Sequence, residues 1–107
     1  MLFRSKNNLI IYIMSNYVIT DYSYNQAKKL NLIITSSKNR NKKIDVYTIN
    51  NEFLNSIGDI RYNDYPYYCI IYNKQYADER RRLYHIRHQK GINIINSKQY
   101  LSANLLW

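Results

Sequence analysis

The longest helical pattern of the chain is NDYPYYCIIYNKQYADERRRLYHIRHQK, residues Asn63–Lys90. This stretch holds the single proline, the single cysteine and both histidines. Pro66 suits the first turn of a helix, because the N–H that proline lacks would be unpaired there. Asn73 predicts an interruption, since asparagine tolerates a left-handed closing residue. A second helix is therefore predicted over Gln75–Lys90.

The second helix carries a narrow apolar seam. Tyr76, Leu83 and Ile86 recur with helical spacing and are expected to face the core. Cationic side chains surround this seam. Asp78 and Glu79 are expected in the first turn of the helix, where the helix dipole favours acids. We interpret this helix as the working element of the chain.

The preceding residues alternate between apolar and polar side chains and predict strands. Asparagines at 50–51 predict a tight turn with positive φ, and Gly58 is expected to close the last strand. The strands are expected over 32–36, 43–49 and 52–57, with an extension over 60–62 after a bulge. The outcome is a short three-stranded antiparallel meander packed against two or three helices, an α+β fold.

Two further helices are predicted from their capping residues. Ser23 and Gln26 have the spacing of a capping box for a helix over 24–30. Ser97 is expected to cap a last helix over 98–107.

The chain of 107 residues is expected to form one domain. Residues 1–13 are interpreted as an extension or disordered leader, with Met14 as the true start. The domain then spans 14–107 and opens with a short strand over 17–20.

The charge balance predicts an anionic partner. The formal net charge is +9, from 16 Lys and Arg against 7 Asp and Glu. Nucleic acid is the first expectation and a phospholipid surface the second. Arginines cluster in the second helix, and the guanidinium group can bind phosphate with two parallel hydrogen bonds. Cys69 has no partner for a disulfide framework, which suits a reducing compartment rather than secretion.

These cations define the predicted nucleic-acid-binding surface, with neighbouring tyrosines able to stack on bases. The predicted residues are Lys42, Lys43, Arg61, Arg80, Arg81, Arg82, His85, Arg87, His88 and Lys90. The alternative interpretation is a solvated helix face on which Asp78 and Glu79 pair with Arg82 and Lys74.

Catalytic and metal chemistry have weaker signals. His85 and His88 are three residues apart and could share a metal, but a third ligand would have to arrive through folding. No metal, cofactor or catalytic residue is therefore predicted. A small nuclease similar to the GIY-YIG class is a third hypothesis, since Tyr, Arg and Glu are present, although its paired tyrosine motifs are not.

Four segments carry a resemblance to a known family. They are KKIDVY (42–47), SIGDIRYNDYPYY (56–68), QYADERRRLYHIRHQKG (75–91) and LLW (105–107). The chain resembles an uncharacterised family of small basic proteins encoded by giant nucleocytoplasmic DNA viruses. The resemblance implies a viral protein in the host cytoplasm, in the viral factory or in the virion, and it implies no activity.

Together these observations predict non-catalytic, sequence-tolerant binding of nucleic acid, DNA before RNA. The alternative is a structural or minor capsid-type protein that uses the same cations against acidic viral proteins.

Overall fold

Three antiparallel strands form one sheet in the computed structural model, which describes residues 16–107. The strands are β1 (Leu32–Ser36), β2 (Lys42–Thr48) and β3 (Phe53–Asp59), in the order β1-β2-β3. Ile34 lies opposite Val46, and Ile44 lies opposite Ile57, so the apolar residues of all three strands reach the same face. The predicted α+β meander is confirmed.

The strand boundaries differ from the prediction at the third strand. β3 continues through Gly58 to Asp59, and residues 60–62 form a turn rather than an extension of the strand. Gly58 has φ of 81°, a backbone conformation that residues with a side chain rarely adopt. A Cβ at this position would lie 2.8 Å from Leu106 and 2.9 Å from Lys43, so glycine also makes room for both neighbours.

Asparagine supplies the left-handed turn residues in this glycine-poor chain. Asn51 has φ of 67° between β2 and β3, as predicted for the asparagine pair. The Thr48 hydroxyl accepts hydrogen bonds from the Asn50 and Glu52 N–H groups and closes the hairpin. Asn31, between α2 and β1, has φ of 57°.

The first described helix, α2 (Asp21–Lys29), begins earlier than predicted. Thr20 is its N-cap and accepts from the Ser23 N–H, so the predicted Ser23 capping box is wrong. The Ser23 hydroxyl is buried and instead donates to the Leu105 carbonyl over 2.6 Å. The predicted strand over 17–20 is also wrong, because this segment is irregular and pairs with no strand of the described sheet.

The stretch around Pro66 forms two helices, α3 (Tyr65–Ile71) and α4 (Lys74–Arg87). The predicted break at Asn73 is confirmed, but Asn73 is the N-cap of α4 rather than a left-handed end of α3. Because α4 begins at Lys74, no acidic residue falls in its first turn, contrary to the prediction. Its C-cap is His88, so α4 ends before the predicted bound at Lys90.

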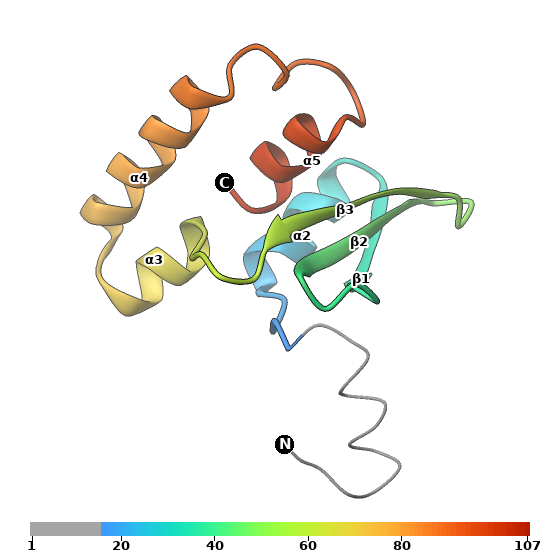
Figure 1. The fold of residues 1–107 in the computed structure, drawn as a ribbon, viewed down its shortest axis with the longest axis horizontal. Helices are drawn as coiled ribbons and strands as arrows, with labels where there is room; N and C mark the ends of the chain where they lie inside the picture. Colours follow the sequence, from blue (N-terminus) through green and yellow to red (C-terminus); the bar gives the residue numbers. More distant parts are fainter. Residues whose placement is uncertain (1–15) are drawn as a thin grey trace, which may run out of the picture.

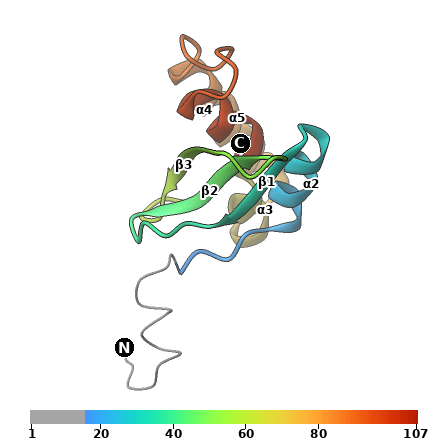
Figure 2. The same ribbon diagram turned by 90° about the vertical axis from the view of Figure 1, so that its right-hand side faces the viewer.

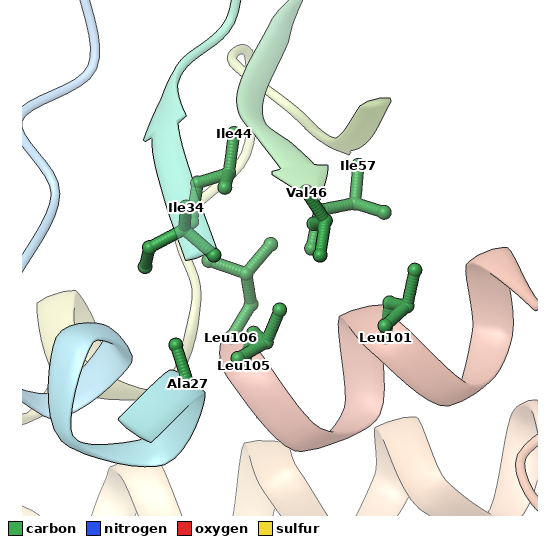
Figure 3. Packing of buried hydrophobic residues seen from close by; sticks show 8 residues of the cluster. All are labelled: Ala27, Ile34, Ile44, Val46, Ile57, Leu101, Leu105 and Leu106. Atoms are coloured by element: carbon green, nitrogen blue, oxygen red, sulfur yellow. The ribbon is translucent and has the colours of Figure 1, made fainter. Parts of the chain in front are cut away.

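The core lies between the sheet, α2 and α5 (Lys98–Leu105), as Figure 3 shows. Ser97 caps α5 as predicted, by accepting from the Tyr100 N–H. The buried core residues are Ala27, Ile34, Ile44, Val46, Ile57, Leu101, Leu105 and Leu106.

Helix α4 stands away from this core. In Figure 1 α5 lies between α4 and the sheet, and α4 makes most of its contacts with α3. Figure 2 likewise places α4 beyond α5. The predicted core seam on α4 is wrong: Tyr76 is 43% exposed, Ile86 is 51% exposed, and Leu83 is half-buried outside the core. Of the described residues in α4, Ala77 alone is buried.

Two matched substitutions to alanine distinguish a core side chain from a side chain of α4. Leu101→Ala should lower the free energy of unfolding by about 2–5 kcal/mol, because it opens a cavity where the wild-type side chain is fully buried. Leu83→Ala should cost clearly less, since that side chain is half-buried on α4. Urea unfolding of both variants checks the difference. Equal losses would contradict the assignment of Leu83 to a site outside the core.

Candidate nucleic-acid interface

A groove of about 450 Å³ separates the middle of α4 from the sheet and α5. A second hollow of about 200 Å³ shares Lys42, Tyr84 and His88 with it and adds Lys98. We call these two adjoining hollows the basic groove. Its charged and aromatic lining residues are Lys42, Lys43, Asp59, Tyr62, Tyr68, Arg80, Tyr84, Arg87, His88, Lys98 and Trp107.

Four cations of the groove make no ion pair in the described part of the chain. Lys42 comes from β2, Arg80 and Arg87 come from α4, and Lys98 comes from α5. Within residues 16–107, no carboxylate lies at ion-pairing distance from any of these four side chains. Their charges therefore remain available to a ligand.

The one carboxylate that lines the groove among residues 16–107 is already bound. Arg61 donates to both oxygens of Asp59, over 2.7 Å from Nη2 and 3.0 Å from Nε. These hydrogen bonds lower the pKa of Asp59 well below its usual range, with a smaller contribution from the charge of Lys42. The predicted site residue Arg61 is thus exposed but paired.

Aromatic rings form one wall of the groove. Trp107 stacks on Tyr84 with ring centroids 4.4 Å apart and planes 9° apart. His88 packs against the Tyr84 ring at 4.2 Å, and Tyr68 approaches Trp107 at 6.0 Å. Tyr62, at the mouth, is 64% exposed. The groove therefore combines cations with rings of the kind on which bases stack.

Arg80 is half-buried, whereas Arg87 and Lys98 are exposed. Its guanidinium lies 5.6 Å from the centroid of the Tyr68 ring. Its Nε is buried and finds no hydrogen-bond acceptor among the described residues. A buried donor without an acceptor costs about 1–3 kcal/mol.

His88 has a lowered pKa in this groove. Burial, followed by the nearby charge of Arg87, lowers the pKa of His88 below its usual value of 6.5. Burial also raises the pKa of Tyr84. At neutral pH the positive charge of the groove therefore comes from its lysines and arginines.

Asp64 lies at a buried junction between the sheet, α3 and the segment before α2. Its carboxylate accepts from Lys43 Nζ over 2.8 Å and from the Tyr17 hydroxyl over 2.6 Å. The same side chain caps α3 by accepting from the Tyr67 N–H. Lys43, a predicted site residue, is 3% exposed and is occupied by this carboxylate.

Tyr17 stays protonated in this junction. Burial, followed by the negative charge of Asp64, raises the pKa of Tyr17 far above its usual value. Its hydroxyl therefore acts as a donor, and it ties the segment before α2 to the start of α3.

The other predicted cations of α4 lie outside the basic groove. Arg82 donates to Glu79 over 2.6 and 3.0 Å, and Arg81 lies 3.6 Å from Asp78. His85 shares with both arginines a hollow of about 600 Å³ on the other side of Trp107. Its Nε2 is buried and has no partner in the described part of the chain.

The three consecutive arginines therefore have different environments. Arg81 covers the Tyr65 ring at 3.8 Å, and Tyr65 in turn donates to Asp78 over 2.9 Å. Burial, followed by that hydrogen bond, raises the pKa of Tyr65 to about 12. Lys90 lies exposed beyond α4 and lines none of the three hollows.

Sequence reasoning missed Lys98 and the role of Trp107. Trp107 is half-buried, packs against the edge of the core, stacks on Tyr84 of α4 and lines hollows on both sides. The spacing of Tyr84 from the arginines gave a signal for aromatic rings near the cations. Nothing local to Lys98 predicts that it lies near Lys42.

No metal centre is apparent among residues 16–107, where no three His, Cys, Asp or Glu side chains gather closely enough to share an ion. In the same range, no helix has the length and apolar character needed to cross a bilayer. Comparisons of the chain with protein-family models, with curated proteins and with solved structures found no match.

The Asp64 junction can be tested by matched amide substitutions. Asp64→Asn keeps a capping residue for α3 but leaves the Lys43 ammonium buried without a counter-charge. We expect the free energy of unfolding to fall by about 3–5 kcal/mol. Asp59→Asn removes the exposed partner of Arg61 and should change stability much less. Chemical denaturation of both proteins measures the contrast, and similar losses would argue against a supporting role for the buried pair.

Proposed function

We propose that this protein binds nucleic acid through the basic groove, without catalysis and with little preference for sequence. The observation that carries the proposal is the convergence of Lys42, Arg80, Arg87 and Lys98 at one groove, with no acidic partners among the described residues. A phosphate backbone offers the repeated negative charge that such a set can bind.

The chemistry of the groove favours tolerance of sequence. Lysine and arginine bind phosphate oxygens, which are the same at every nucleotide. The exposed ring of Tyr62 offers a face rather than a hydrogen-bonding edge, and every base has a face that can stack. In the viral setting implied by the family resemblance, the ligand would be viral DNA in the factory or the virion.

The proposal does not depend on Arg81, Arg82 or Lys43. Each of these side chains has a carboxylate at ion-pairing distance. Binding by these three would first require the loss of an existing ion pair. The groove cations have no such cost, so they define the surface that should bind the ligand.

The test is a salt titration of binding to labelled DNA of two unrelated sequences. The wild-type protein should bind both sequences similarly, and log K should fall linearly as log salt rises. Arg80→Gln together with Arg87→Gln should weaken binding by about tenfold or more, as expected for the loss of charge-assisted hydrogen bonds. The salt slope should fall by roughly 0.7–0.9 for each phosphate that the variant no longer neutralises.

The matched control is Arg81→Gln together with Arg82→Gln, which removes the same charge from two arginines that are paired with acids and lie outside the basic groove. This control should retain most of the affinity. An equal loss in both double variants would show that net charge, rather than the groove, determines binding. Failure of the wild-type protein to bind either DNA at low salt would overturn the proposal.

A further inference from the structure

The cations of α4 that are available for binding line the basic groove. Arg80 packs over Tyr68, and Arg87 lies 5.9 Å from the centroid of the Tyr84 ring. The remainder of α4 carries the Arg82–Glu79 ion pair and the exposed apolar side chain of Ile86. Helix α4 therefore lacks the continuous cationic outer face that would lie along a duplex.

The size of the groove limits what can enter it. The larger hollow is about 450 Å³, which lies in the range of sites for single small molecules. A base-paired duplex can present only its outer backbone to such a site. A single strand can place a phosphate and its unpaired base inside, because its bases are not held in a stack with a partner strand.

The interior of the groove offers complementary groups for both parts of a nucleotide. The Arg80 side chain lines the groove and makes no ion pair within residues 16–107, so its guanidinium can donate to a phosphate oxygen. Tyr62 is exposed at the mouth, and Arg61 lies 5.4 Å from its ring centroid. Trp107, stacked on Tyr84, forms an aromatic wall deeper inside.

We infer that the basic groove selects single-stranded over double-stranded nucleic acid. A backbone phosphate would bind at Arg80 and Arg87, and an unpaired base would stack on the aromatic lining, beginning at Tyr62. This inference rests on the proposed function and narrows it to one class of ligand.

The experiment compares a short single strand of mixed sequence with the blunt duplex that it forms with its complement. Both are titrated at the same salt concentration, and the fluorescence of Trp107, the only tryptophan in the chain, is recorded. The single strand should bind about tenfold more tightly for each base that stacks. It should also change Trp107 fluorescence, whereas the duplex should change it much less.

A matched pair of variants tests the stacking step. Tyr62→Leu removes an exposed ring at the groove and should weaken binding of the single strand severalfold, with the duplex nearly unaffected. Tyr24→Leu removes a ring that is 49% exposed on α2, outside the groove, and should change neither affinity. Thermal unfolding of both variants checks that the fold is retained.

The outcomes separate the two proposals. Equal or tighter binding of the duplex, with no effect of Tyr62→Leu on the single strand, would overturn the selection of single strands and leave nucleic-acid binding intact. Absence of binding to either form at low salt would overturn both.

Discussion

The buried ion pair between Lys43 and Asp64 is the constraint on which the rest of the structure depends. It joins the middle strand of the sheet to the residue that caps α3. Both side chains are almost completely buried, so each requires the other to avoid an uncompensated charge. The neighbouring Tyr65 N–H donates to the Leu106 carbonyl over 3.0 Å, which fixes the start of α3 to the end of α5. The direction of α3, and with it the position of α4, follows from this junction.

The charged residues therefore have different structural roles. Lys43 and Asp64 serve the fold, whereas Arg81 and Arg82 are paired with acids across one turn of α4. Four other cations make no ion pair within residues 16–107, and they come from three separate elements to one groove. Charge in this protein therefore differs in role according to position, which a net charge of +9 does not reveal.

The parts of the fold that could be predicted are those with local causes. Alternating apolar residues predict the strands, and Pro66 and Asn73 predict the two helices, because each signal acts within a few residues. The exposed seam of α4 could not be predicted in this way. Tyr76, Leu83 and Ile86 have a helical spacing. However, α5 packs on the sheet in the place where α4 would have to lie to bury these side chains.

The kinds of residue at the candidate site could be predicted from the sequence, but which of them lie together in the fold could not. A cluster of arginines beside tyrosines indicates an anionic ligand, and that much can be read from the chain. The pairing of Arg82 with Glu79 is local to one turn of α4, whereas the meeting of Arg80 and Arg87 with Trp107 at the groove arises only on folding. Lys42 and Lys98 meet at one hollow although they are far apart in the sequence, and no periodicity encodes such a meeting.

The loose attachment of α4 has a dynamic consequence. Apart from its packing on α3, this helix is held to the body largely by aromatic contacts such as the Tyr84–Trp107 stack, and it shares little of the aliphatic core. Such a helix can open as a unit at a lower free energy than global unfolding requires. Opening would widen the groove while the sheet, α2 and α5 remain closed around their own core. A long polymer could thus enter from the side, without threading an end through the protein.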